Sequence, residues 1–143
     1  MKYSYYPKRD AIKNYFPLPN EIFLLRLKPG ELAVYAYLLY CEDRETYQCW
    51  PSYTTIGKAI GRTKNTVMQY VDALSEKGLI STEPTSVLTK SKIKKNGNLR
   101  YTIRPIHEAV EIFHTRQLSA IERTTERRQI QRKLSEMDLL PGA

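Results

Sequence analysis

The 143-residue chain has few of the residues from which catalytic and metal sites are built. It contains two histidines, His107 and His114, which lie seven positions apart. The segment that begins at His107 reads H-E-A-V-E and lacks the second histidine of a zinc-binding H-E-x-x-H motif. A glycine-rich phosphate-binding loop and the motifs of a catalytic triad are also missing. These absences predict a protein that is not an enzyme and that holds no metal ion or cofactor.

Paired cysteines and long apolar runs are absent as well. Cys41 and Cys49 form no C-x-x-C pair, and we expect both to be small packed side chains. The longest apolar run, from Leu32 to Cys41, has ten residues and contains tyrosines, so it is too short for a membrane span. The N-terminus, M-K-Y-S-Y-Y-P-K-R-D, lacks the apolar core of a signal peptide. A cytoplasmic protein without a membrane partner is expected.

What the chain has in excess is positive charge, with 23 Lys/Arg against 15 Asp/Glu and a net charge of +8. The excess is uneven. Residues 1–57 carry 7 Lys/Arg against 6 Asp/Glu, residues 58–104 carry 10 against 3, and residues 105–143 carry 6 against 6. Hydrophobic content of 41% is ordinary for one soluble folded domain. A local net charge of +7 suits either a nucleic acid or an acidic membrane surface, and its coincidence with the helix pattern described below favours the nucleic acid.

The N-terminal part predicts an arm and two helices. Residues 1–15 form a tyrosine-rich arm, and the prolines hold residues 16–19 extended. Asn20 is then placed to cap a short helical turn that runs through Leu25. Pro29 and Glu31 fit the first turn of a core helix. Its apolar positions are Leu32, Val34, Tyr35, Ala36, Leu38 and Leu39, followed by a polar loop over residues 42–47 and a short strand over residues 48–50.

Residues 50–80 carry the most informative pattern, which predicts two helices joined by a tight glycine turn. Ser52 caps a helix over residues 53–60, and Gly61 supplies a left-handed turn. Thr63 caps a second helix that runs to about residue 77 and is ended by Gly78. At 100° per residue, the core side of this second helix comprises Val67, Tyr70, Val71 and Leu74.

The opposite side of the second helix predicts a DNA-reading surface. Asn65 and Gln69 are four residues apart, and each amide can bond the major-groove edge of adenine twice. Asp72 and Glu76 follow on the same side and would repel phosphates, so only the first two turns enter the groove. The candidate contacts from this helix are Arg62, Thr63, Lys64, Asn65, Thr66, Met68 and Gln69. The alternative is an amphipathic surface helix whose exposed residues bind nothing.

A basic hairpin follows the second helix. Strands are predicted over residues 79–82 and 99–103, the latter with Leu99, Tyr101 and Ile103 on one face. Between them lies a lysine-rich segment closed by a tight turn at Asn96-Gly97. Alternation places Lys90, Lys92 and Lys94 on one side. The candidate contacts from the hairpin and from the start of the first helix are Lys90, Lys92, Lys94, Lys95, Arg100, Ser52 and Tyr53. Such lysines can follow phosphates or enter the minor groove; alternatively, they keep the hairpin soluble.

A long helix is predicted from residue 106 onwards. Its stripe of Ile106, Val110, Phe113, Ile121 and Thr124 predicts packing that ends near Thr125. Ile130, Leu134 and Met137 project nearly opposite to this stripe. Together with Ile112, we expect these three residues to form the contacts of a homodimer.

The residues from Cys49 to Ile80, with the lysine-rich hairpin and L-R-Y-T-I-R-P at residues 99–105, resemble the bacterial winged helix-turn-helix family. Its most specific parts are W-P-S at residues 50–52, T-V at residues 66–67 and E-K-G-L-I at residues 76–80. Regulators of Gram-positive bacteria and mobile elements have such domains. The N-terminal domains of plasmid replication initiators are also similar, with an F-x-x-P segment like residues 16–19. Arg62 departs from the family pattern, in which an apolar residue is usual in the turn.

This resemblance implies a mainly helical fold, with a three-helix core, a small β-hairpin wing and a long C-terminal helix. It implies sequence-specific double-stranded DNA binding, commonly by a dimer, with no small-molecule ligand evident. We expect an arm and short helix over residues 1–28, the DNA-binding domain over residues 29–104 and a dimerisation helix over residues 105–143. A transcriptional regulator from a plasmid, phage or other mobile element is the leading hypothesis. The alternatives are a replication initiator that binds an origin, and a protein-interaction module in a replication or segregation assembly.

Overall fold

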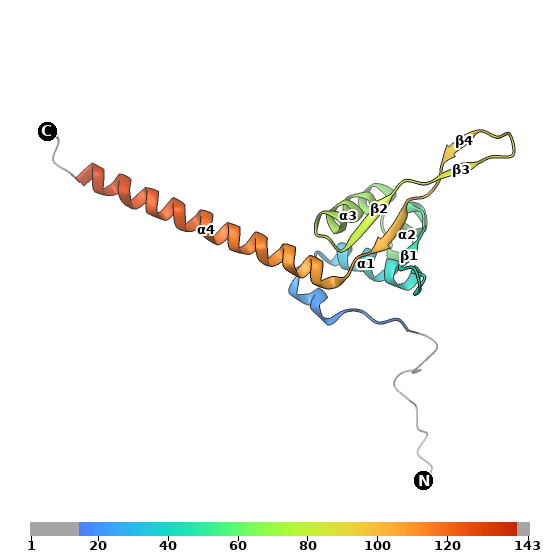
Figure 1. The fold of residues 1–143 in the computed structure, drawn as a ribbon, viewed down its shortest axis with the longest axis horizontal. Helices are drawn as coiled ribbons and strands as arrows, with labels where there is room; N and C mark the ends of the chain where they lie inside the picture. The colour runs from blue at the N-terminus through green and yellow to red at the C-terminus, as the bar shows by residue number, and fades with distance from the viewer. Residues whose placement is uncertain (1–14, 140–143) are drawn as a thin grey trace, which may run out of the picture.

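The computed structural model describes residues 15–139, apart from the side chains of residues 94, 95 and 139. Three helices, α1 (Pro29–Cys41), α2 (Tyr53–Ile60) and α3 (Lys64–Glu76), pack with a small antiparallel sheet. A hairpin and a long helix extend from this body in opposite directions (Figure 1). Nearly all of the arm expected over residues 1–15 lies outside the described residues. Among the described helices, none combines the length and the apolarity that crossing a bilayer requires.

The short N-terminal helix, η1 (Asn20–Leu24), is a 3-10 helix with Ile22 buried. The expectation that Asn20 caps it is wrong. Pro19 occupies the cap position, and no side chain makes a capping hydrogen bond there. Instead, the backbone N–H of Ile22 donates to the carbonyl of Pro19 at 3.2 Å. In a 3-10 helix each hydrogen bond joins residues three positions apart, so the bond from Ile22 makes Pro19 the cap residue, one position before Asn20.

Helix α1 (Pro29–Cys41) is the central core helix. As predicted, Pro29 and Glu31 lie in its first turn. Its most buried apolar residues are Val34, Tyr35, Leu38 and Leu39, whereas Leu32 and Ala36 are only half-buried. Cys41 and Cys49 are free thiols that pack against the same core, and the Cys49 Sγ lies 3.7 Å from the carbonyl oxygen of Leu38.

Helices α2 (Tyr53–Ile60) and α3 (Lys64–Glu76) follow the sequence prediction closely. Ser52 and Thr63 are their capping residues, as expected. Gly61 ends α2 with a φ of 72°, and Gly78 follows α3 with a φ of 80°. Positive φ values of this size strain residues that have a Cβ atom, which explains glycine at both positions.

The three-stranded sheet has the order β1-β5-β2 and is antiparallel. Its strands are β1 (Gln48–Cys49), β2 (Ile80–Glu83) and β5 (Arg100–Ile103). The central strand β5 buries Tyr101, and Leu99 and Ile103 pack against the core, as the predicted alternation requires. The sheet therefore holds the base of the hairpin against the helical body.

The hairpin is a separate two-stranded sheet made of β3 (Ser86–Leu88) and β4 (Lys94–Asn96). The predicted turn at Asn96-Gly97 is wrong, because Asn96 is a strand residue paired with Ser86. The chain instead turns over residues 89–93. Lys90 and Lys92 lie in this turn, and Lys92 has a φ of 58°. The extended alternation expected for Lys90, Lys92 and Lys94 therefore does not exist.

Helix α4 (Ile106–Leu139) is continuous, but its packed part is shorter than predicted. Ala109 is buried and Phe113 packs against the core, whereas Ile121 is 62% exposed. The prediction that packing extends to Thr125 is therefore wrong. The apolar stripe continues along the helix, but the helix has already left the body, so the stripe meets no further part of the described chain (Figure 1).

Candidate nucleic-acid interface

The entry to α3 is held by a compact turn between the two helices. The backbone N–H of Arg62 donates to the carbonyl of Gly57 at 2.9 Å. A Cβ atom added at Gly57 would lie 2.5 Å from the carbonyl oxygen of Arg62, so only glycine fits there without a shift. The hydroxyl of Thr63 accepts a hydrogen bond from the backbone N–H of Thr66 at 3.4 Å. These contacts fix where the positive end of the α3 dipole lies.

The two sides of α3 have opposite character. Val67, Val71 and Leu74 are buried against the core. Asn65 and Gln69 are exposed, as the helical spacing predicts. The two acidic residues further along this side, Asp72 and Glu76, are exposed too. Residues 15–139 thus leave the polar face of α3 uncovered, with its amides in the first two turns and its carboxylates behind them.

The residues around these amides differ in how freely they can reach a ligand. Thr63, Lys64 and Met68 are exposed. Thr66 is half-buried, and its hydroxyl lies 3.0 Å from that of Thr63, so both hydroxyls take part in the cap. The exposed guanidinium of Arg62 donates to the carbonyl of Gly61 at 3.2 Å. Arg62 therefore does not pack in the core position that its apolar counterparts would fill.

The residues proposed at the start of α2 are engaged within the protein. The Ser52 hydroxyl accepts from the backbone N–H of Thr55 at 3.0 Å. Tyr53 is half-buried against the core, and its burial, together with the negative charge of Asp72, raises the pKa of its hydroxyl. Both residues shape α2 and its contact with α3.

The base of the hairpin is tied to the body by polar contacts. The guanidinium of Arg100 forms an ion pair with Glu83 on the neighbouring strand. The side-chain amide of Asn98 donates to the carbonyl of Trp50 at 3.1 Å, which links the hairpin to the segment just before α2. Lys90 and Lys92 are exposed in the turn, while the side chains of Lys94 and Lys95 lie outside the described residues. These contacts attach the base of the hairpin to the body, whereas Lys90 and Lys92 lie at its far end.

A buried ion pair holds the far end of α3. The Lys77 ammonium donates to the two carboxylate oxygens of Glu31 at 2.6 and 3.1 Å, and Glu31 also accepts from the backbone N–H of Lys28 at 3.0 Å. Burial acts to raise the pKa of Glu31, but the hydrogen bonds and charges of Lys77 and Lys28 lower it overall. From the sequence, Glu31 was predicted only to lie in the first turn of α1, and its ion pair was missed. Its partner lies 46 residues away, and no local signal connects the two.

Sequence reasoning also missed an apolar hollow of about 640 Å³ beside the N-terminal segment. Its walls come from residues 17–19, the end of α1, residues 46–47 and residues 102–106. The Glu42 Oε2 on one wall is buried without a hydrogen-bond partner among residues 15–139, and burial raises the pKa of Glu42. Since four separate segments form this hollow, no single motif could reveal it.

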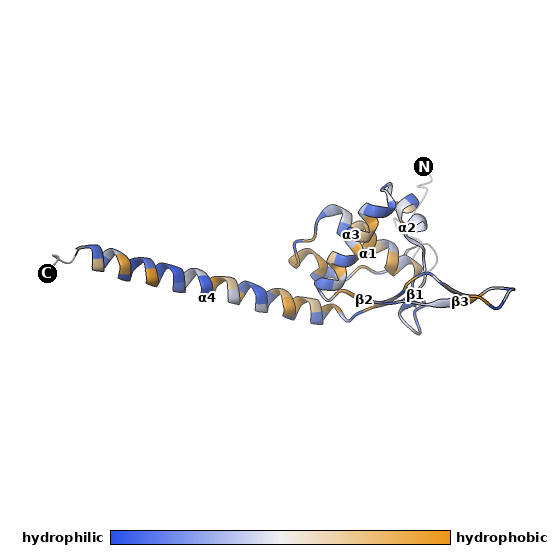
Figure 2. Cartoon of the chain, turned by 90° about the horizontal axis from the view of Figure 1, so that it is seen from above, coloured by the Kyte–Doolittle hydropathy of each residue, from blue (hydrophilic) through white to orange (hydrophobic). Residues whose placement is uncertain are grey.

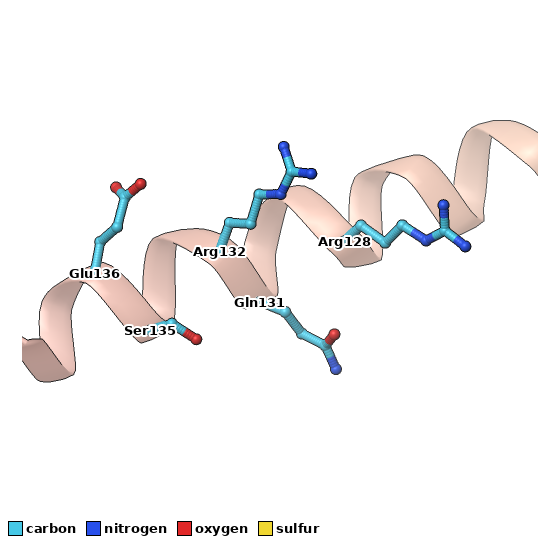
Figure 3. A pocket seen from close by; sticks show the side chains of 5 residues that line it. All are labelled: Arg128, Gln131, Arg132, Ser135 and Glu136. Carbon is cyan, nitrogen blue, oxygen red and sulfur yellow. The ribbon is translucent and has the colours of Figure 1, made fainter.

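A second hollow lies on the distal half of α4, where it is lined by Arg128, Gln131, Arg132, Ser135 and Glu136 (Figure 3). One helix alone bounds it, so it cannot enclose a ligand. Within residues 15–139, no three His, Cys, Asp or Glu side chains gather in a way that could hold a metal ion.

Comparison with known proteins identifies the central motif. Residues 25–80 match the family described as "Helix-turn-helix domain". Over these residues the chain is therefore similar to a helix-turn-helix domain. No curated protein matches the chain.

Solved structures are similar in fold. A possible transcriptional regulator from Methanosarcina mazei Go1 is 19% identical, with a TM-score of 0.51, over 73% of this chain and 79% of that one. A MarR-like transcriptional regulator from Thermotoga maritima is 18% identical over 88% and 86%, with a TM-score of 0.41. The Staphylococcus aureus MepR–DNA complex is 15% identical over 82% of each chain, with a TM-score of 0.39. The first of these structures, together with the order of helices and strands described above, confirms the predicted winged helix-turn-helix fold with a long C-terminal helix.

Proposed function

We propose that this protein binds double-stranded DNA in a sequence-specific way and acts as a transcriptional regulator. The observation that carries the proposal is the exposed first half of α3, where Asn65 and Gln69 project from a helix whose other side is buried. Side-chain amides of this kind can bond adenine in two places, and the helix dipole favours an anion at this end.

The charge distribution supports the same orientation. Residues 58–104 carry 10 Lys/Arg against 3 Asp/Glu, and Arg62 and Lys64 are exposed beside the amides. Asp72 and Glu76 would repel phosphates further along α3. The helix therefore enters the major groove by its first two turns, and the hairpin reaches the neighbouring backbone. In this proposal residues 29–104 make the DNA contact.

The distal part of α4 supplies the contact between two copies. Ile130, Leu134 and Met137 are 57%, 55% and 66% exposed, and their helical spacing places them on one side. Ile112, expected in the same contact, is half-buried and lies over Gly78 of its own chain. We therefore assign the dimer contact to the three distal residues. Two copies would present two α3 helices, as the pseudo-palindromic sites of helix-turn-helix proteins require.

A plasmid or phage origin, and a role in starting replication, are narrower forms of this proposal. They keep the same DNA contact and differ only in where the site lies. The rival role, a protein-interaction module, rests on the exposed apolar side of α4. It would give a stable protein partner and no retention of duplex at low salt.

Selection of duplexes from a random pool, followed by titration at several salt concentrations, tests the proposal. Affinity is expected to fall as salt rises, because lysine and arginine displace counterions from the phosphates. Asn65→Ala with Gln69→Ala is expected to weaken binding by roughly 10²-fold, since each amide contact with a base contributes about 1–3 kcal/mol. Gln117→Ala with Gln131→Ala, which removes two exposed amides from α4, is the matched control. Binding that responds to neither salt nor the α3 pair would contradict the proposal.

A further inference from the structure

The tip of the hairpin exposes large apolar side chains as well as lysines. Leu88 is 73% exposed and Ile93 is 58% exposed, at the two positions where the strands enter the turn. Val87, one position further back, is 56% exposed. Exposed aliphatic side chains at the end of a solvated hairpin cost solvation free energy, so their presence requires an explanation other than packing within the fold.

These apolar side chains lie on both faces of the hairpin. Leu88 pairs with Lys94, and Val87 pairs with Lys95. Since successive side chains of a strand alternate between faces, Leu88 and Val87 lie on opposite faces of β3, and Ile93 is the turn residue directly before β4. Figure 2 shows the apolar band on the projecting hairpin, away from the rest of the body. A tip that is apolar on both faces can contact two parallel flat surfaces at once.

The turn that carries the tip is closed by hydrogen bonds. The backbone N–H of Thr89 donates to the carbonyl of Ile93 at 3.0 Å, and the backbone N–H of Lys92 donates to the carbonyl of Thr89 at 2.9 Å. The Thr89 side chain bonds the backbone of Ile93 as well. The turn therefore fixes Leu88 and Ile93 relative to each other before any partner arrives.

The charge around the tip selects the partner. Residues 84–103 contain five Lys/Arg and no Asp/Glu. Lys90 and Lys92 are exposed between the two apolar side chains. A partner must therefore offer an apolar, flat surface flanked closely by negative charge. The base-pair stack of duplex DNA, bordered by phosphates on both sides of its minor groove, has this character.

We propose that the hairpin tip is a wedge that enters the minor groove, inserts Leu88 and Ile93 at a base-pair step and bends the duplex. Lys90 and Lys92 bind the phosphates on either side. Apolar wedges in the minor groove unstack base steps and kink DNA by about 20–90°. This inference rests on the proposed DNA binding and adds DNA bending to it. Flexible steps such as TA and CA/TG are then preferred at the wedge position, without base-specific contacts.

The test uses a duplex selected by the wild-type protein, with a donor and an acceptor dye at its ends and 2-aminopurine at the step nearest the hairpin. The variant is Leu88→Ser with Ile93→Ser. The matched control is Leu118→Ser with Ile121→Ser, which removes the same two side-chain types from exposed positions on α4. Thermal unfolding checks that both variants fold, and Leu88→Ser alone serves if the double variant does not.

Wild-type protein and the α4 control are expected to raise both the energy transfer between the dyes and the 2-aminopurine fluorescence. The tip variant is expected to bind the duplex about tenfold more weakly, since it buries less apolar surface. It should keep the salt dependence, and its bound duplex should remain straight and stacked.

A straight duplex with wild-type protein, or equal bending by the tip variant, would overturn the wedge and leave the DNA-binding proposal standing. Absence of duplex binding by wild-type protein would instead overturn both. The last measurement compares the binding of wild-type protein and of the tip variant to anionic phospholipid vesicles. If the tip variant loses binding to them while the duplex signals stay unchanged, the apolar tip serves a membrane surface and the wedge is wrong.

Discussion

Lys77 and Glu31 form a buried ion pair that joins the end of α3 to the first turn of α1. The Lys77 Nζ lies 2.6 Å from the Glu31 Oε1, and Glu31 is only 2% exposed. The Lys77 side chain is one-third exposed, so its ammonium remains in partial contact with water. The two partners are thus unequal, because the carboxylate depends on the pair more than the ammonium does.

This inequality gives an expected order of stability for two variants. Lys77→Met removes the ion-pair partner of a buried carboxylate, which retains the backbone N–H of Lys28, and is expected to destabilise the fold by about 3 kcal/mol. Glu31→Gln is expected to cost less, since its amide oxygen can still accept from the backbone N–H of Lys28 and the ammonium of Lys77 can turn to water. Urea unfolding of the two single variants and the double variant measures this. An equal or larger loss for Glu31→Gln would contradict the account.

The same pair predicts a pH dependence. Because the folded-state pKa of Glu31 is lowered below its ordinary value of 4.5, its contribution to stability is fully present above that value. The contribution is lost as the pH falls through the folded pKa. The difference in unfolding free energy between wild type and Glu31→Gln is therefore expected to shrink in acid. Measurements from about pH 7 down to about pH 2 test this, and a difference that grows in acid would refute it.

The two glycines with positive φ that flank α3 are expected to tolerate substitution differently. Gly61→Ala meets no atom within 4 Å, so only the left-handed backbone opposes it, at about 1–2 kcal/mol. Gly78→Ala adds a collision, since its Cβ would lie 2.5 Å from the Cδ1 of Ile112. Thermal unfolding is expected to show a larger loss for Gly78→Ala. Adding Ile112→Ala to Gly78→Ala should relieve the collision but not the strain of the left-handed backbone at residue 78. An equal loss of stability for Gly61→Ala and Gly78→Ala would show that the collision contributes nothing.

Self-association is expected to depend on one side of distal α4. Ile130→Glu with Leu134→Glu places two charges in the proposed contact and should yield monomers in sedimentation experiments. Leu118→Glu with Ile121→Glu makes the same change on the opposite side and should leave the dimer intact. A wild-type protein that is monomeric at every concentration would reject the proposed contact, as would dissociation caused only by the second pair.

Local signals in the sequence were sufficient for most of the helical core. Capping side chains and glycines act on their immediate neighbours, so Ser52, Gly61, Thr63 and Gly78 mark the helix boundaries correctly. The buried side of α3 was predictable for the same reason, because a regular helix fixes the angle between its side chains.

The remaining features depend on contacts that no local pattern encodes. Asn96-Gly97 is a favoured turn dipeptide, but the pairing of Ser86 with Asn96 places the turn elsewhere. The stripe on α4 continues regularly past the point where the body ends, so periodicity could not show where packing stops. The bond between Lys77 and Glu31 required knowledge of which helix ends meet in space.

The N-terminal turns of α4 lie against the C-terminal end of α3. The Arg116 guanidinium donates to the carbonyl of Glu76 at 3.1 Å, and Ile112 lies against Gly78. At about 1.5 Å per residue, the 34-residue helix is about 50 Å long, yet only its first turns touch the body. Most of α4 therefore projects from the body, and its attached end lies beside the helix that is proposed to enter the major groove. Any movement of α4 relative to the body must therefore break the contacts of Arg116 and Ile112 at the end of α3 or carry that end with it.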